Sequence, residues 1–299
     1  MFSKLKHPTN PNRFDVCIIG AGSVGVEQAL KFSAKQRVAI VDDGWLGGQL
    51  TLAELVLVSL ERAQSQSIES AEVMSWLRLE LSNQAQRLDT KGRLQSSGVT
   101  ILSGPAVFAS LNAISIRNVL HESKAFVVAT GVSPIIPEID GLNSVRYYTL
   151  VNFKDLTKLP SRLVVLGSDP MGLGLATAAA RLGCRVSVLM PSDQKTDALD
   201  AAKVRSSGVN IIKVDGIGSV EKLQKAVKVN YHGGLAVSAV AAEVIVLAYG
   251  WQPNLGLDLV KANVNFSEKG IPTDARGQTN VKTIFAAGAV ARAEKPPPD

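Results

Sequence analysis

The chain has few of the side chains that carry out most enzymatic chemistry. Its 299 residues include two cysteines and three histidines. Cys17 and Cys184 lie far apart, with no CxxC spacing and no neighbouring His or Cys to complete a metal site, so we expect no metal centre. Both cysteines lie in or beside apolar runs. This predicts buried apolar fillers in a reducing compartment, and hence a cytoplasmic protein.

Long apolar runs and clustered positive charge are also missing. No run reaches membrane-spanning length. The 32 Lys and Arg exceed the 26 Asp and Glu, giving a net charge of +6, but beyond a short basic start they are scattered. That spread argues against a nucleic-acid partner. Residues 1–13 are polar with two prolines, which predicts a flexible N-terminal arm without the apolar core of a signal peptide.

What the chain does contain is 46% hydrophobic residues, enough for two domains with their own cores. An apolar run at 16–19 leads into Gly20-x-Gly22-x-x-Gly25, then an Ala- and Leu-bearing helix, then a second apolar run at 38–41 that ends on Asp42. This order of strand, glycine turn, helix, strand and acid predicts a dinucleotide site.

Each conspicuous residue of this stretch has a mechanical use in such a site. Gly20 permits the tight turn, Gly22 lets a pyrophosphate approach the backbone, and Gly25 lets helix and strand pack closely. The amides at the helix start can hold phosphates, and Asp42 can accept hydrogen bonds from a ribose. The alternative, a Rossmann unit that binds no nucleotide, stays open.

The middle of the chain predicts further regular elements. Residues 50–67 and 69–98 are rich in helix formers and lack proline, which predicts two helices. Strands are expected at 99–102, 115–120 and 125–129, the last ending on Thr130-Gly131.

The opening pattern then recurs. A strand at 163–166, the turn Gly167-Ser-Asp-Pro-Met-Gly172, a helix at 173–182 and a strand at 185–189 predict an internal duplication of the nucleotide-binding unit. Later apolar segments predict strands at 209–214, 226–231 and 244–248, and a short strand that ends on Gly288.

Several segments in order resemble the FAD-dependent pyridine nucleotide-disulfide oxidoreductases, most closely the mercuric reductase and dihydrolipoamide dehydrogenase branch. They are GAGSVG (20–25), LGG (46–48), VVATGVSPIIPEIDG (127–141), LPSRLVVLG (159–167), AYGWQPN (248–254) and TIFAAG (283–288). The resemblance implies an α/β fold with two Rossmann-like three-layer dinucleotide-binding domains, the second inserted into the first. The implied FAD domain comprises 14–145 and 265–299, and the NAD(P)-binding-like domain 146–264.

The resemblance also implies two cofactors and the residues that bind them. FAD would be bound by Gly20, Gly22, Gly25, Asp42, Gly47, Gly48, Thr130, Gly131 and Gly288. NAD(P)H would be bound at Gly167 and Gly172.

The residues of the family's disulfide chemistry are replaced. Leu50 and Leu55 occupy the positions of the two redox cysteines, and Ser59 and Gly174 those of a lysine and its glutamate partner. Losing both members of an ion pair avoids leaving one buried charge unpaired. We therefore expect no disulfide reductase and assign no catalytic residue.

Three further departures bear on the cofactors. Asp169 stands at the middle glycine of the second turn, where with Pro170 it can cap the helix and, at an effective dielectric of about 20, oppose a phosphate by a few kcal/mol. Met190 ends the next strand in place of a ribose-binding residue. Ala289 replaces an aspartate that bonds the flavin's ribityl chain, a loss of about 1.5–3 kcal/mol.

Three interpretations follow. The chain can be a flavoprotein that passes electrons from NAD(P)H to an unidentified quinone, dye or protein acceptor. It can instead be an inactive relative kept as a dinucleotide-binding, regulatory or structural protein, or a truncated product. Without the family's dimerisation domain and its His-Glu pair, the usual homodimer is not expected. His121 and His232 are predicted to be ordinary surface residues.

Overall fold

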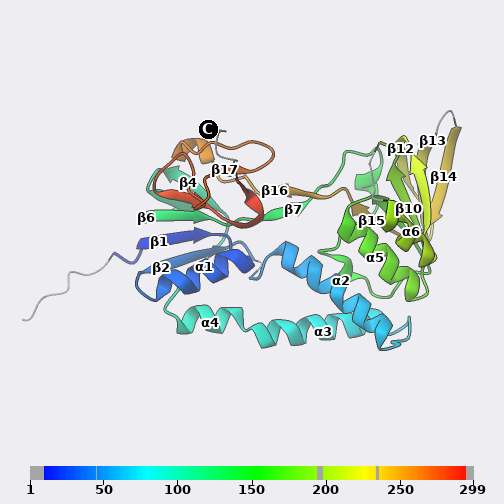
Figure 1. Cartoon of the computed structure of the whole chain (residues 1–299), viewed down its shortest axis with the longest axis horizontal. Helices are drawn as coiled ribbons and strands as arrows, with labels where there is room; N and C mark the ends of the chain where they lie inside the picture. The colour runs from blue at the N-terminus through cyan, green and yellow to red at the C-terminus, as the bar shows by residue number, and fades with distance from the viewer. Residues whose placement is uncertain (1–9, 45, 194–197, 234–235, 294–299) are drawn as a thin grey trace, which may run out of the picture. The chain divides into compact units, whose positions relative to one another are not determined.

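The protein, seen in a computed structural model, forms two compact units (Figure 1). The structure describes residues 10–44, 46–193, 198–233 and 236–293. Unit 1 takes its residues from 1–51, 88–133 and 252–299, and unit 2 from 52–87 and 134–251. Residues 52–87 and 134–145, placed by sequence in the FAD domain, lie in unit 2, and residues 252–264, placed by sequence in the NAD(P)-binding-like domain, lie in unit 1.

Unit 1 is built on a parallel sheet whose strands run in the order β3-β2-β1-β6, with β18 on the other side of β6. An antiparallel pair, β4 and β5, extends the sheet from the first half of β6. The strands are β1 (Arg13–Ile19), β2 (Val38–Asp42), β3 (Thr100–Ser103), β4 (Ala106–Ser110), β5 (Ala113–Ile116), β6 (Val119–Val128) and β18 (Ile284–Ala286).

Both faces of this sheet are covered, which explains the continuous apolar run of β1. Val16 and Ile18 pack with residues of α1 (Ser23–Ser33) and α4 (Thr90–Ser96). Cys17 and Ile19 pack on the other face, against β4, β5 and the C-terminal segment. That segment contributes η3 (Leu259–Ala262), β17 (Ile271–Thr273), η4 (Gly288–Val290) and β19 (Ala291–Ala293). Strands buried on both faces are expected to be uniformly apolar.

Unit 2 repeats this plan. Its parallel sheet has the order β11-β10-β9-β15-β8, which matches β3-β2-β1-β6-β18 strand for strand and confirms the predicted duplication. The strands are β8 (Tyr147–Tyr148), β9 (Arg162–Gly167), β10 (Arg185–Pro191), β11 (Asn210–Val214) and β15 (Val244–Ala248).

The sheet of unit 2 also lies between two layers. Helices cover one face: α2 (Gln49–Ser65), α3 (Val73–Leu88), α5 (Pro170–Arg181) and α6 (Ala198–Ser206). An antiparallel sheet covers the other: β12 (Gly216–Lys222), β13 (Val227–Gly233) and β14 (Ala236–Ala242). Two short helices, η1 (Leu142–Ser144) and η2 (Phe153–Asp155), complete the unit. The boundaries of the two units fall within the paired strands β7 (Val132–Pro134) and β16 (Trp251–Pro253). The predicted three-layer α/β fold is thus confirmed in both units.

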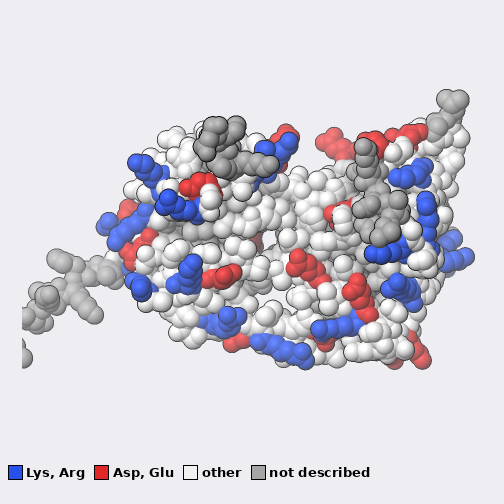
Figure 2. Space-filling model, viewed as in Figure 1, with Lys and Arg blue, Asp and Glu red and all other residues white. Residues whose placement is uncertain are grey.

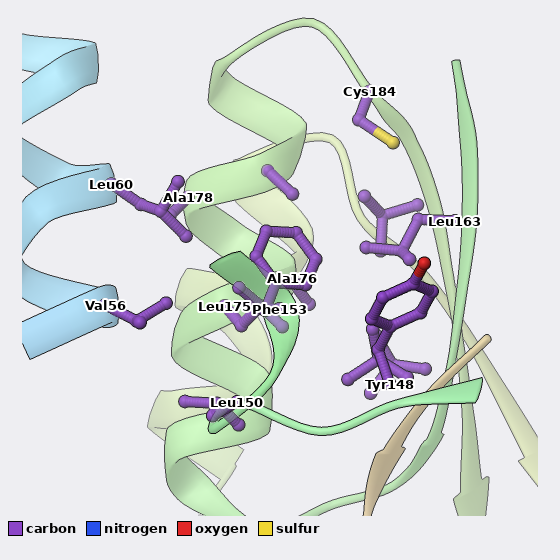
Figure 3. Close-up of a cluster of buried hydrophobic side chains, with 14 of the residues drawn as sticks. Val56, Leu60, Tyr148, Leu150, Phe153, Leu163, Leu175, Ala176, Ala178 and Cys184 are labelled. Carbon is purple, nitrogen blue, oxygen red and sulfur yellow. The ribbon is translucent and has the colours of Figure 1, made fainter. Parts of the chain in front are cut away.

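Helix α2 belongs to the core of unit 2. Val56 and Leu60 project from it toward Leu175 and Ala178 of α5 (Figure 3). Both α2 side chains are fully buried. This packing explains why residues 52–87 join unit 2 in the structure.

Two sequence predictions need correction. The strand expected at 115–120 is a hairpin, because Arg117 and Asn118 have positive φ angles of 49° and 65° and Ile116 pairs with Val119. Two such residues form the tight turn whose twist suits a two-residue hairpin.

The single helix expected within 69–98 is also interrupted. Asp89 adopts a left-handed φ of 36°, ends α3, and accepts a hydrogen bond from the Gly92 amide at 3.2 Å to start α4. Aspartate bonds its local backbone readily, and this competes with a continuous helix.

Figure 2 shows Lys and Arg as well as Asp and Glu distributed over the face that it draws. Within the described ranges, no helix is both long and apolar enough to cross a membrane.

Candidate functional site

Four strands of unit 1 end at one edge of the sheet, and their following residues form the candidate site. Because β1, β2, β6 and β18 are parallel, their carboxyl ends meet there and bring Gly20, Asp42, Thr130 and Gly288 to the same edge. The chain leaves β1 and β6 in the middle of this sheet, at the point where open α/β sheets bind ligands.

Gly20 and Gly25 are required by packing within the protein. A Cβ on Gly20 would lie 2.3 Å from the Ala129 carbonyl oxygen, and the residue has a φ of +110° that favours glycine. A Cβ on Gly25 would lie 2.0 Å from the Gly20 carbonyl oxygen. These glycines bring β1, α1 and β6 together as the sequence predicts, so they shape the turn whether or not a ligand is present.

Gly22 differs, because a side chain there would fit the protein. It is the N-cap of α1 with φ −69° and ψ 177°, angles that any residue can adopt. A Cβ on it would meet nothing closer than the Gly48 Cα at 3.8 Å. Among the described residues, no side chain caps this helix. The first-turn amides of α1 therefore lie beside a position that Gly22 leaves clear, an arrangement that suits an anionic group.

The Leu46-Gly47-Gly48 segment lies against this turn. The Gly47 amide donates to the Ala21 carbonyl oxygen at 2.7 Å, and Gly22 and Gly47 form an isolated parallel bridge. Gly48 has a φ of +84°, and a Cβ there would lie 2.9 Å from the Gly22 Cα. The segment therefore forms part of the wall beside Gly22.

Asn254 organises the loop after β6, and sequence reasoning assigned it no role. Its side-chain amide donates to the Thr130 carbonyl oxygen at 2.8 Å, and its backbone amide donates to the Gly131 carbonyl oxygen at 3.0 Å. The Thr130 hydroxyl donates to the Asn254 carbonyl oxygen at 2.8 Å. Asn254 thus positions the predicted pair Thr130 and Gly131. The available signal was its place at the end of AYGWQPN, a segment noted only for its resemblance.

Asp42 and Gly288 complete the edge. The Asp42 carboxylate, half-buried at the end of β2, accepts a hydrogen bond from the Gly44 amide at 3.1 Å. Gly288 has a φ of +74°, and a Cβ there would lie 3.2 Å from Cγ2 of Val24 in the first turn of α1. The adjacent Ala289 is exposed and offers only a methyl group.

All nine residues predicted for FAD lie in unit 1, at or beside this edge: Gly20, Gly22, Gly25, Asp42, Gly47, Gly48, Thr130, Gly131 and Gly288. They fit a dinucleotide in two respects. The α1 N-terminus beside Gly22 suits a pyrophosphate, and Asp42 offers a carboxylate at the end of the second strand.

The two residues predicted for NAD(P)H, Gly167 and Gly172, lie in the corresponding turn of unit 2. Its N-cap is filled from within the chain. The Asp169 carboxylate accepts hydrogen bonds from the amides of Met171 at 3.1 Å and Gly172 at 3.2 Å, and Pro170 occupies the first helical position. This confirms the cap that the sequence predicts.

The positions at which the resemblance implies redox cysteines and a lysine-glutamate pair carry Leu50, Leu55, Ser59 and Gly174. Leu50 and Leu55 are half-buried on α2. Ser59 is fully buried, and its hydroxyl has no hydrogen-bond partner among the residues described. A Cβ on Gly174 would meet Cδ2 of Leu57 at 3.0 Å. At Gly174, the packing of α2 on α5 therefore places an apolar side chain where the resemblance would imply the glutamate of an ion pair.

Both cysteines are buried, as predicted. Cys17 is 1% exposed and Cys184 5% exposed. Burial raises the pKa of each thiol to about 12. Neither forms a reactive thiolate at neutral pH. Over the part of the chain that the structure describes, no group of three or more His, Cys, Asp or Glu is arranged to hold a metal ion.

The surface position predicted for His121 is wrong. The residue lies within β6 at 8% exposure, with its ring centroid 6.4 Å from that of Phe14. Burial lowers the pKa of its imidazole, because the charged form loses hydration. His232, near the end of β13, is exposed as predicted.

Comparison with known proteins finds one family model that matches nearly the whole chain. A family model described as pyridine nucleotide-disulphide oxidoreductase matches residues 14–298. A mercuric reductase from Staphylococcus aureus is 27% identical, with 93% of this chain and 56% of that protein covered. A dihydrolipoyl dehydrogenase from Bacillus subtilis is 27% identical, with 91% and 66% covered. The chain thus spans about half to two thirds of the length of these curated relatives.

Solved structures show the same fold. The HOCl-induced flavoprotein disulfide reductase RclA from Escherichia coli superposes with a TM-score of 0.82 at 21% identity, covering 92% of this chain and 66% of that chain. Its Cu(II) complex gives a TM-score of 0.84 at 20% identity, with 93% and 66% covered.

Proposed function

Since the chain belongs to the pyridine nucleotide-disulphide oxidoreductase family, we propose that unit 1 binds FAD and that the protein is a flavoprotein oxidoreductase. FAD and NAD(P)H are the cofactors of this family. We further propose that the electrons go to an acceptor other than a cysteine pair of this chain.

The N-terminus of α1 is the observation that carries the FAD assignment. Gly22 caps this helix without a side chain although a side chain would fit there, so protein packing does not explain the glycine. In unit 1, the amides of this first turn would hold the pyrophosphate and Asp42 would accept from the adenosine ribose. Asn254 would keep Thr130 and Gly131 in place beside them.

The proposal that no internal disulfide takes part rests on the cysteines and their replacements. Leu50 and Leu55 have no thiol, and the pKa of each native cysteine is raised to about 12 by burial. Cys17 belongs to unit 1 and Cys184 to unit 2. When bound, FAD itself supplies two-electron chemistry between a reduced donor and an acceptor such as a quinone, a dye or a redox protein.

A second candidate is a dinucleotide-binding protein without turnover, retained for a regulatory or structural role. The observation that favours it is that three sets of family residues are replaced together. The two cysteines and the lysine-glutamate pair are replaced, and Ala289 stands in place of the ribityl aspartate.

The visible spectrum of the purified protein separates these functions. With FAD supplied, the first candidate predicts flavin bands that bleach when a reductant is added without air and return when an acceptor is added. Acceptor reduction should exceed that of free FAD at the same concentration. Stable bands with no excess turnover favour the second candidate. A chain that retains no flavin after refolding with excess FAD overturns the proposal that it is a flavoprotein.

A further inference from the structure

The first glycines of the two turns have closely similar geometry. Gly167 has a φ of +106°, and a Cβ on it would lie 2.2 Å from the Ala248 carbonyl oxygen. The values for Gly20 are +110° and 2.3 Å, measured to the Ala129 carbonyl oxygen. Each glycine thus packs against the end of the strand beside its own, β15 in one unit and β6 in the other. The protein backbone has kept the same turn twice.

At the N-cap the turns part. Gly22 and Asp169 hold the same place, with similar extended angles of φ −69°, ψ 177° and φ −55°, ψ 135°. Gly22 carries no side chain, whereas the Asp169 carboxylate bonds the amides of Met171 and Gly172. The remaining residue of that first turn, Pro170, has no N–H. Every amide position of the first turn of α5 is therefore either bonded to Asp169 or absent.

The ends of β2 and β10, the strands that follow the two turns, also differ, because only β2 ends in a group that suits a nucleotide. Val41 pairs with Ile19, which precedes the first turn, and Leu189 pairs with Leu166, which precedes the second. The next residues are Asp42 in unit 1 and Met190 in unit 2. Met190 is fully buried and presents a thioether where unit 1 has a carboxylate. A ribose hydroxyl would find no acceptor of comparable strength in that side chain.

We propose that the second turn is closed to a dinucleotide, with the Asp169 carboxylate standing where a pyrophosphate would otherwise be held. The chain then takes a single dinucleotide, in unit 1, and a reduced nicotinamide that donates electrons is not held through the turn of unit 2. The residues of unit 2 thus do not fit the family's second cofactor. The inference about Asp169 stands whether or not unit 1 retains FAD, whereas the single dinucleotide in unit 1 rests on the proposed function.

The test is titration with ADP-ribose in place of NAD(P)H. It carries the pyrophosphate and both ribose groups but lacks the nicotinamide ring, so it binds without donating electrons. Isothermal titration calorimetry is run on the full chain with saturating FAD, so that unit 1 is occupied. The wild-type chain should show no saturation up to about 1 mM, a dissociation constant at which binding is worth only about 4 kcal/mol. Asp169→Gly should bind at least about tenfold more tightly, because it frees two amides and removes a negative charge.

Two matched variants test whether the carboxylate at the N-cap is responsible for the effect. Asp169→Asn keeps a capping oxygen without the charge and should stay close to wild type, because asparagine is as good an N-cap as aspartate. Gly22→Asp places the same carboxylate in unit 1, where the backbone accepts it and a Cβ has room. It should weaken FAD binding at least about tenfold, measured by fluorescence of the released flavin.

Three results overturn the inference: saturation of the FAD-loaded wild-type chain by ADP-ribose below about 100 µM, no gain in Asp169→Gly with unchanged circular dichroism, or unchanged FAD affinity in Gly22→Asp. A wild-type chain that holds no FAD refutes the flavoprotein proposal instead. In that case Asp169→Gly is compared with wild type in a Gly22→Asp background, where the same gain is expected.

Discussion

Gly20 and Gly22 lie two residues apart in the first turn, and each lacks a side chain for a different reason. At Gly20 a Cβ would collide with the Ala129 carbonyl oxygen at 2.3 Å, whereas at Gly22 the nearest atom is 3.8 Å away. The first glycine serves the packing of the fold. The second leaves the N-terminus of α1 clear for a ligand.

Alanine at Gly20 should therefore affect mainly stability, and alanine at Gly22 mainly FAD binding. Gly20→Ala should lower the free energy of unfolding by about 3 kcal/mol or more, because it adds backbone strain to a steric clash. Gly22→Ala should change it by less than about 1 kcal/mol but weaken FAD binding at least about tenfold, because its methyl group lies beside the phosphate-binding amides. Urea unfolding and flavin titration measure the two quantities. Equal FAD affinity in Gly22→Ala and wild type would contradict the assignment of the pyrophosphate to this turn.

His121 gives the protein a pH dependence that acts on stability. Its imidazole lies within β6 and its Nδ1 atom has no partner among the described residues. Burial lowers its pKa in the folded protein, while in the unfolded chain it titrates near about 6.5. The unfolded state therefore binds more protons as the pH falls below about 6.5, and the stability present above that pH is progressively lost.

Replacing this side chain should flatten that dependence. We expect His121→Leu to lose less unfolding free energy than wild type between about pH 7 and about pH 5, by up to about 1 kcal/mol, because no imidazole must stay neutral in the fold. Urea unfolding curves at several pH values measure the difference. Parallel curves for the two proteins would show that His121 does not carry this effect.

At the scale of elements, α2 is the clearest departure from the domain plan predicted by sequence. Its apolar side chains pack onto α5 within unit 2, with Leu57 over Gly174 and Leu60 facing Ala178 (Figure 3). Leu55, at one of the two positions where the resemblance implies a redox cysteine, is also packed against this core. The helix is thus a structural component of unit 2.

This role predicts a large cost for truncating its buried side. Leu60 is 0% exposed, so Leu60→Ala should lower the free energy of unfolding by about 3 kcal/mol through lost burial and a cavity. Val58, on the same helix, is 43% exposed, and Val58→Ala should change stability by about 0.5 kcal/mol at most. Chemical denaturation of both variants measures the contrast. Similar small losses would mean that α2 does not contribute to the core.

The elements also show where sequence patterns reach their limit. The glycine turns, the strands beside them and the Asp169 cap were predictable, because each depends on residues close in sequence. The hairpin turn at Arg117-Asn118 and the break at Asp89 were not predicted, because none of these three residues is glycine, the residue that most readily adopts a positive φ. The burial of His121 was missed because it depends on contact with residues distant in sequence, such as Phe14 of β1.

For the whole molecule, the duplicated architecture predicts that a single dinucleotide stabilises one unit. FAD at about a hundredfold excess over its dissociation constant should add about 2.7 kcal/mol to unit 1. Amides of β1 and β6 that exchange only through unfolding should therefore exchange up to about a hundredfold more slowly. Peptides from β12–β14 should be unaffected.

Hydrogen exchange followed by mass spectrometry measures this directly. ADP-ribose, added without FAD, serves as a control that should bind the same site more weakly, because it shares only the ADP moiety with FAD. Equal protection of β12–β14 would show that the two units unfold as one block, contrary to their separate cores.

The sequence by itself determined the two Rossmann-like units, the glycine-rich first turn and the leucines at positions 50 and 55. These follow from local steric needs of glycine, from apolar strands buried on both faces and from residue identity. Only the tertiary structure decided that α2 and α3 build the core of unit 2, that Asn254 holds the Thr130 loop, and that Gly22 has room for a side chain it does not carry. These depend on distances between segments far apart in the chain, which no local pattern encodes.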